Sequence, residues 1–181
     1  MARTAGFADA LTVQVGVPMQ TLAQITAELS SVSSGRDHLV HRSRLKVRIG
    51  AVAPISNVLI VDDTTFDAEV LGSILRLVFD PAIRVRHVKF ARDIRKAILD
   101  EMPQLLFLDD RLGHGTSAEV SLNVIRTAGY HTRVIVMSGL LTRVRQIELM
   151  RLGVADLIHK DDMNVARVTE AVLKVLDTPA V

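Results

Sequence analysis

From residue 57 onward, short apolar runs alternate with longer segments whose apolar residues recur at helical spacing. Each run is short enough for a strand, and each is followed by a segment long enough for a helix. Three of the runs are almost continuously apolar, which is typical of parallel strands buried on both faces of a sheet. Successive strand and helix pairs connect by right-handed crossovers, so the pattern predicts an α/β fold with a doubly wound parallel sheet.

Five strands and five helices are expected. The strands are residues 57–61 (NVLIV), 83–88 (IRVRHV), 105–108 (LLFL), 133–137 (RVIVM) and 156–159 (DLIH). The helices are residues 65–79, 91–101, 117–129, 141–153 and 164–176. The run IRVRHV alternates between polar and apolar residues, which predicts an edge strand. Gly129 and Gly153 stand where two helices end, and glycine there favours a left-handed terminal residue.

The first 56 residues have a different character from the rest. Apolar residues at helical spacing predict a helix over about 18–32, and a serine cluster after it predicts a break. The segment 36–49 is rich in Lys and Arg and is expected to be a basic linker. We therefore expect an N-terminal extension over 1–56, one domain over 57–177 and a short tail over 178–181.

Composition excludes several kinds of site. The chain has no cysteine, so it has no disulfide, thiolate zinc site or thiol nucleophile. Its longest apolar runs have about five residues, whereas a membrane span needs roughly 20. There is no secretory leader pattern, and we expect a cytoplasmic protein without membrane contact. Aromatic residues make up 3%, and no recognition-helix pattern accompanies the basic linker, so nucleic-acid binding is disfavoured.

Polar side chains follow four of the predicted strands. They are Asp62, Asp63, Asp109, Asp110, Ser138 and Lys160. In a parallel sheet all of them emerge at one edge, where such folds bind ligands. Several carboxylates beside one lysine repel one another strongly unless a cation neutralises them, and Mg²⁺ takes this kind of oxygen ligand. Carboxylate, hydroxyl, ammonium and Mg²⁺ together predict phosphoryl transfer to a carboxylate.

Residues 57–177 resemble the receiver domain of two-component response regulators. The resemblance rests on four motifs in order, LIVDD, LLFLDDRLGHG, VIVMSG and ADLIHKDD, with receiver-like spacings. It covers about two thirds of the chain. It implies the flavodoxin-like strand order 2-1-3-4-5, Mg²⁺ or Mn²⁺ as cofactor, and a histidine kinase or phosphotransfer protein as partner. A homodimer is left open.

The resemblance also assigns roles to individual residues. It implies that Asp62 and Asp63 are the acidic pair that binds Mg²⁺, and that Asp109 accepts the phosphoryl group. It implies that Ser138 is the switch hydroxyl and that Lys160 contacts the phosphate.

The loop DDRLGHG is similar to the D-x-R-L-G-x-G variant of receivers, in which the first aspartate is the acceptor. Asp109 and the backbone carbonyl of Arg111 would then join the metal ligands. Strand alternation agrees, because Asp109 and Asp110 cannot both point into one site from an extended backbone. Asp110 is expected to be a loop residue that affects specificity or local charge. Leu157 stands where receivers usually carry the aromatic switch residue.

We expect a phospho-acceptor that assists its own phosphorylation and dephosphorylation, not an enzyme with turnover. It would signal by protein–protein contact, without a C-terminal output domain. One alternative is a Mg-dependent aspartate-nucleophile phosphohydrolase, which needs a second carboxylate two residues after Asp62, where Thr64 stands. The other is a phosphate-independent pseudo-receiver that acts as a binding module. The intact acids, Ser138 and Lys160 count against it.

Overall fold

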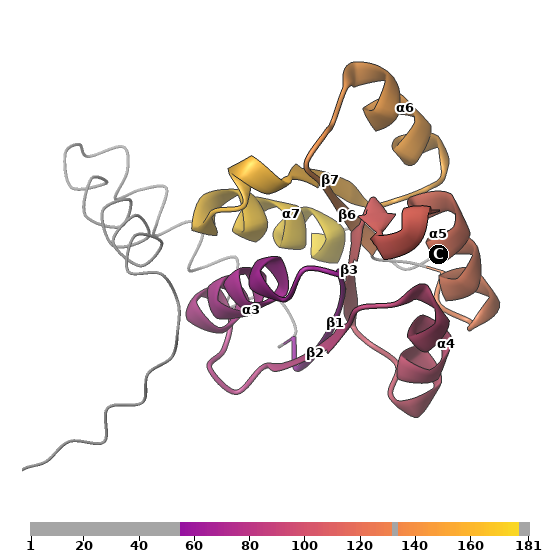
Figure 1. Cartoon of the computed structure of the whole chain (residues 1–181). Helices are drawn as coiled ribbons and strands as arrows, with labels where there is room; N and C mark the ends of the chain where they lie inside the picture. Colours follow the sequence, from indigo (N-terminus) through magenta and orange to yellow (C-terminus); the bar gives the residue numbers. More distant parts are fainter. Residues whose placement is uncertain (1–54, 132–133, 178–181) are drawn as a thin grey trace, which may run out of the picture. The chain divides into compact units, whose positions relative to one another are not determined.

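A five-stranded parallel sheet forms the centre of the part of the chain that the computed structural model describes, residues 55–131 and 134–177 (Figure 1). Its strands are β1 (Asn57–Val61), β2 (Arg84–Val88), β3 (Leu105–Asp109), β6 (Val134–Ser138) and β7 (Asp156–His159). Their spatial order is β2-β1-β3-β6-β7, and every pairing is parallel. Counted along the chain, this is the expected order 2-1-3-4-5, and β2 is an edge strand as predicted.

Five helices cover the two faces of the sheet. They are α3 (Thr65–Val78), α4 (Ala91–Asp100), α5 (Ala118–Thr127), α6 (Arg143–Arg151) and α7 (Val165–Asp177). Helices α3 and α7 lie on one face, and α4 and α5 lie on the other (Figure 1). Helix α6 contributes Leu149 to the same apolar cluster as α4 and α5. The fold is therefore the doubly wound three-layer arrangement that the sequence predicts.

The central strands are buried along their whole length, and alternate side chains serve opposite layers. In β1, Ile60 packs in the cluster formed with α3 and α7, whereas Leu59 packs in the cluster formed with α4 and α5. In β3, Phe107 and Leu106 divide in the same way. Each such side chain stabilises the fold by roughly 1.5–3 kcal/mol through burial. This two-sided packing fixes the register, and with it the level at which each strand ends.

A small antiparallel ribbon follows β3 and was not predicted. It consists of β4 (Arg111–Leu112) and β5 (Thr116–Ser117), joined by a 3-10 turn over Gly113–Gly115. Two-residue strands are too short to leave a periodic pattern in the sequence. At Gly113 a Cβ atom would lie 3.1 Å from Asp63 Oδ2, so the turn passes very close to that carboxylate.

Several expectations lie outside the described residues. They are the helix over 18–32, the basic linker over 36–49, nearly all of the extension over 1–56 and the tail over 178–181. The domain boundaries stay predictions. Within residues 55–131 and 134–177, no helix has both the length and the apolar character that a membrane crossing needs.

Candidate functional site

The parallel register brings the ends of four strands to one edge of the sheet. Val61 pairs with Leu108, so Asp62 and Asp109 each stand one position beyond a paired residue. Ser138, the last residue of β6, pairs with His159, and Lys160 follows directly. These side chains come from distant parts of the chain and meet because all the strands run in the same direction.

Three carboxylates gather at this edge. One oxygen each of Asp62, Asp63 and Asp109 lies within 4.8 Å of the others. Asp62 and Asp109 are buried, whereas Asp63 is open to solvent. The Asp62 carboxylate is held in place because its Oδ1 accepts a hydrogen bond from the Thr64 amide at 2.8 Å. Carboxylate oxygens with one open side are what Mg²⁺ or Mn²⁺ uses while it keeps water ligands, so these residues fit such an ion.

Lys160 ties the acidic residues together. Its Nζ lies 2.9 Å from Asp62 Oδ2, 2.8 Å from Asp67 Oδ2 and 3.0 Å from Asp109 Oδ2. Burial alone would lower the pKa of this lysine, but hydrogen bonds to the three carboxylates outweigh burial and raise it. Lys160 is therefore a permanent cation at the centre of what we call the acidic pocket. The pocket comprises Asp62, Asp63, Asp67, Asp109 and Lys160.

Asp67 belongs to the acidic pocket, although it was not among the predicted site residues. It lies in the first turn of α3, where a carboxylate is expected for its favourable interaction with the helix dipole. An acid at the start of a helix is so common that its contact with Lys160 is not recognisable from the sequence. Asp67 reaches the strand ends because it lies about one helical turn after Asp62 and Asp63.

Negative charge in the acidic pocket exceeds what one lysine can offset. Burial raises the pKa of Asp109 to about 6, and the nearby charge of Asp62 adds to the effect. Burial also raises the pKa of Asp62, against the opposing hydrogen bond from Lys160. Raised carboxyl pKa values mean that the ionised pocket is strained electrostatically, and a bound cation would relieve that strain.

Ser138 lies at the same edge and is 3% exposed. Its Oγ donates a hydrogen bond to Asp110 Oδ2 at 3.2 Å and accepts one from the Leu140 amide at 3.1 Å. The backbone amide of Arg111 donates to Asp109 Oδ1 at 3.3 Å. Arg111 is thus adjacent to the pocket, and the metal-ligand role of its carbonyl stays a prediction.

Solved structures share the fold and about a quarter of the aligned sequence. The signal receiver domain of a LuxO repressor protein from Vibrio parahaemolyticus is 27% identical, with a TM-score of 0.59, covering 68% of this chain and 92% of that one. The receiver domain of NtrX from Brucella abortus is 25% identical, with a TM-score of 0.60, covering 68% and 100%. The described part of this chain is a response regulator receiver domain.

Other comparisons add less. The BeF₃-activated N-terminal receiver domain of Klebsiella pneumoniae RstA is 18% identical, with a TM-score of 0.53, covering 65% of this chain and 97% of that one. At that identity it supports the fold alone. No protein-family model and no curated protein matches the sequence.

The receiver holds Asp110 in an unexpected environment. Asp110 follows β3 in a bend, but it is 2% exposed and does not act as an open loop residue. Its Oδ1 lies 2.5 Å from Arg145 Nη2, in the first turn of α6. Asp110 thus lies outside the strand, as expected of a loop residue, and its effect on specificity or local charge stays a prediction. Strand alternation does separate the two aspartates as predicted, since Asp109 contacts Lys160 and Asp110 contacts Arg145.

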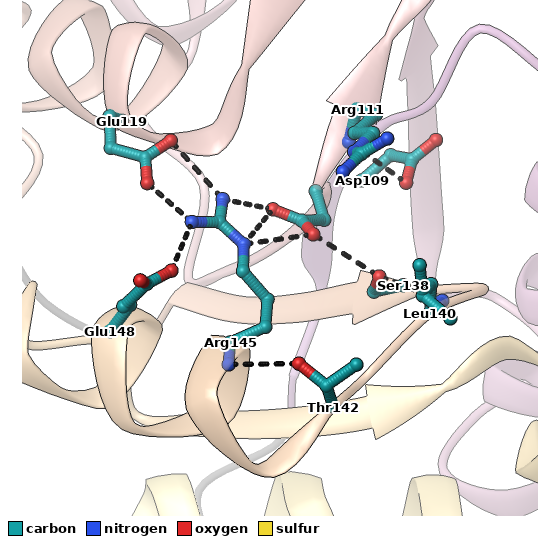
Figure 2. A network of polar contacts seen from close by, with 9 residues as sticks. Asp109, Arg111, Glu119, Ser138, Leu140, Thr142, Arg145 and Glu148 are labelled. Carbon is teal, nitrogen blue, oxygen red and sulfur yellow. Dashed lines mark hydrogen bonds and ion pairs between the residues drawn. The ribbon is translucent and has the colours of Figure 1, made fainter.

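Arg145 connects Asp110 to two helices of the receiver. Its guanidinium lies 2.6 Å from Glu119 Oε1 in α5 and 3.2 Å from Glu148 Oε2 in α6. Figure 2 shows Arg145 with Glu119 and Glu148 on one side and Ser138 on the other. We call this set the Arg145 network: Asp110, Glu119, Ser138, Arg145 and Glu148. Hydrogen bonds from Arg145 and then Ser117 lower the pKa of Glu119 to about 2.

Proposed function

We propose that the receiver accepts a phosphoryl group on Asp109, with Mg²⁺ or Mn²⁺ held by Asp62, Asp63 and Asp109. One observation carries the proposal: three carboxylates lie within 4.8 Å of one another, and Lys160 is in contact with two of them. The carboxylates supply a nucleophile and metal ligands, and the lysine supplies a fixed positive charge. The bound ion would neutralise charge on the carboxylates and on the incoming phosphate.

The proposed donor is a phosphohistidine of a histidine kinase or phosphotransfer protein. An Asp109 carboxylate oxygen attacks phosphorus, the new P–O bond forms, and the P–N bond to the donor imidazole breaks. The imidazole nitrogen keeps the bonding electrons and takes a proton. Negative charge spreads over the equatorial oxygens in the transition state, and a positioned ammonium stabilises it. Lys160 already lies 3.0 Å from Asp109 Oδ2, where those oxygens would be.

We also propose that the domain is a phospho-acceptor and not an enzyme with turnover. Hydrolysis through an aspartyl phosphate in the alternative class needs a second carboxylate two residues after the first. Thr64 stands at that position, and its amide donates to Asp62. We place the protein in the cytoplasm, where the proposed donors act, and a homodimer stays open.

Small-molecule phosphorylation tests the proposal. The protein is incubated with Mg²⁺ and acetyl phosphate, and intact mass is measured for wild type, Asp109→Ala and Asp110→Ala. We expect the mass of one phosphoryl group to be added to wild type and to Asp110→Ala, and not to Asp109→Ala. Chelation of the metal should abolish the shift in every sample.

Three results would contradict the proposal. An unchanged wild-type mass would rule out phosphorylation of this receiver. A shift that survives Asp109→Ala but not Asp110→Ala would move the acceptor to Asp110. Continuous release of inorganic phosphate, many moles per mole of protein, would favour the phosphohydrolase alternative.

A further inference from the structure

Asp110 is placed at a junction of three elements by its backbone as well as by its side chain. Its amide donates to Met137 O of β6 at 2.8 Å, and its carbonyl accepts from the Ala118 amide at the start of α5 at 2.9 Å. The whole residue is 2% exposed. Its side chain accepts hydrogen bonds from Ser138 and Arg145. Because Asp110 is fixed in this way, a displacement at β6 is transmitted to α5 and α6.

Arg145 fixes the beginning of α6 to this junction. Its guanidinium makes paired contacts to both Asp110 and Glu119. Its backbone amide donates to the Thr142 side chain, which caps the helix at 3.2 Å. The guanidinium is mostly buried, and such two-pronged contacts fix orientation as well as distance. The first turn of α6 is therefore tethered to β3 and α5 through one side chain.

Ser138 is the point at which the Arg145 network meets the acidic pocket. It ends β6, which is paired with β3, and in Figure 2 it lies on the same side of the Arg145 guanidinium as Asp109. A serine hydroxyl has a single proton to donate. That proton is given to Asp110 here, so it cannot at the same time be given to an oxygen attached to Asp109. The two acceptors compete for one donor.

The geometry points to a polar relay: Asp110 and Arg145 couple the hydroxyl of Ser138 to the first turn of α6. When the Ser138 hydroxyl donates its hydrogen bond to a phosphoryl oxygen on Asp109 instead, Asp110 loses that donor, and rotation of the Ser138 side chain toward the phosphoryl group also moves its oxygen away from the Leu140 amide. The Asp110 carboxylate is then held only from the Arg145 side, and the tether on α6 loosens. The relay rests on the proposed function, because it needs a phosphoryl group on Asp109. Asp110 and Arg145 act as positioning residues and touch neither donor nor metal.

The relay offers a route that does not need an aromatic side chain on β7. Leu157 carries no polar group and packs at the edge of the apolar cluster with α4 and α5. It cannot follow the Ser138 hydroxyl by hydrogen bonding. The polar contacts that reach Ser138 run instead toward α6, through Asp110 and the Leu140 amide.

Hydrogen exchange with and without phosphorylation tests the relay in the full chain. Mass spectrometry first measures the phosphorylated fraction, and exchange is then followed in a peptide covering residues 140–147. In wild type we expect phosphorylation to speed exchange there about fivefold, as the loss of one hydrogen bond would. In Arg145→Gln the tether is already missing, so exchange is fast in both states and changes by less than about twofold.

Ser138→Ala should also lose most of the response, but for a different reason. The ion pair between Asp110 and Arg145 remains, but no hydroxyl competes, so residues 140–147 respond to phosphorylation much less than in wild type. Ser138→Thr restores the hydroxyl and should restore the response. Arg84→Gln is the matched control, because it removes an exposed arginine ion pair with Glu101 that lies outside the network. Variants that phosphorylate poorly are loaded with Mg²⁺ and beryllofluoride.

The outcomes separate the relay from the proposed function. A wild-type mass shift without any change in residues 140–147 would overturn the relay and leave phosphorylation standing. A full wild-type response in Arg145→Gln or Ser138→Ala would also overturn it. No mass shift in wild type would overturn both. Loss of the response in the Arg84→Gln control would show that any lost arginine produces the effect, which would refute the specific role of Arg145.

Discussion

Asp109 and Asp110 are neighbours in the chain, yet their carboxylates have opposite electrostatic surroundings. In the acidic pocket, burial raises the pKa of Asp109 to about 6, and the nearby charge of Asp62 adds to the effect. The Arg145 network also has more carboxylates than cations, but Glu119 and Glu148 are partly open to water. Its guanidinium lowers the pKa of Glu119 to about 2. Asp109 lies where burial makes its charge costly, whereas Asp110 is paired directly with a guanidinium.

The contrast shows how the alternation of side chains along an extended backbone gives two adjacent aspartates different roles. A buried pocket with excess negative charge is stabilised by any cation it binds, which makes it suitable for metal and phosphoryl chemistry. In the Arg145 network the buried carboxylate of Asp110 already has a cation beside it, and the contacts of Arg145 hold helices α5 and α6 in place. The following predictions test this division, beginning with the largest expected effect.

Removal of a buried residue that we propose as a metal ligand should almost abolish Mg²⁺ binding. We expect Asp62→Asn to weaken Mg²⁺ affinity by at least roughly 50-fold, since even residues behind metal ligands change affinity 10- to 100-fold. Asp110→Asn should change it by less than about threefold, because that carboxylate faces Arg145. The chain has no tryptophan, so titration calorimetry is the suitable measurement. Equal losses in the two variants would mean that the two regions are not electrically separate.

Neutral substitutions should have opposite effects on stability at the two positions. Asp109→Asn removes a charge that burial disfavours, and without Mg²⁺ at pH 7 it should raise the free energy of unfolding by roughly 1–3 kcal/mol. Asp110→Asn weakens a buried ion pair and should lower it by about 1–3 kcal/mol. Urea unfolding in the presence of a chelator measures both. A loss of stability in Asp109→Asn would contradict the strained pocket.

The gain in Asp109→Asn should depend on pH in one direction. The pKa of Asp109 is about 6 in the fold and 3.8 for an ordinary aspartate, so the ionised wild type loses stability from this group as pH rises through about 6. The advantage of Asn is therefore full near pH 7 and vanishes below about pH 4, where the carboxyl is protonated in both states. Saturating Mg²⁺ should reduce or reverse it.

Asp67 gives a smaller test of the acidic pocket. Asp67→Asn removes one negative charge near the proposed metal site and turns an ion pair with Lys160 into a weaker contact. We expect Mg²⁺ affinity to fall about 3- to 10-fold, as about 1 kcal/mol of lost Coulomb attraction would cause. In this variant Lys160 keeps its contacts with Asp62 and Asp109, and a metal ion that binds these two carboxylates has to compete with those contacts. Asp93→Asn is a suitable control, because Asp93 occupies the first turn of another helix, α4. Unchanged Mg²⁺ affinity would mean that the charge of Asp67 does not contribute to metal binding.

Gly113 should give the smallest effect. A methyl group at this position would lie 3.1 Å from Asp63 Oδ2, and the exposed carboxylate can move by a few tenths of an ångström. We expect Gly113→Ala to weaken Mg²⁺ affinity by about twofold, less than the loss of any charged residue of the pocket. Gly139→Ala, where an added Cβ meets no atom within 4 Å, is the matched control.

The strands and the residues at their ends were predictable for one physical reason. Parallel strands buried on both faces leave continuous apolar runs, and parallel direction brings their carboxyl ends together. Strand β3 ends at Asp109 and β6 begins at Val134, each within one residue of the prediction. Helix α5 begins at Ala118 and α6 at Arg143, one and two residues later than expected.

The contacts of Asp110 could not be predicted in the same way. Asp110 and Arg145 are 35 positions apart, and their contact depends on how α6 is placed over the sheet. No local period encodes that placement. Arg145 and Asp67 each lie in the first turn of a helix, and nothing in the neighbouring sequence marks either as a contact of a strand end. The contacts that long side chains make across the fold depend on tertiary packing, which the pattern of a single sequence does not indicate.

The contact between Lys160 and Asp62 spans 98 positions of the chain, and this has a consequence for synthesis. A chain emerging from the ribosome exposes its acidic residues first and its lysine last. Domains generally acquire structure as units during translation, with N-terminal regions first. Before β7 is added, the carboxylates of β1 and β3 have no ammonium group beside them. If the proposed function holds, the newly made receiver accepts a phosphoryl group only after its fifth strand has docked, and chains that end before Lys160 are not phosphorylated.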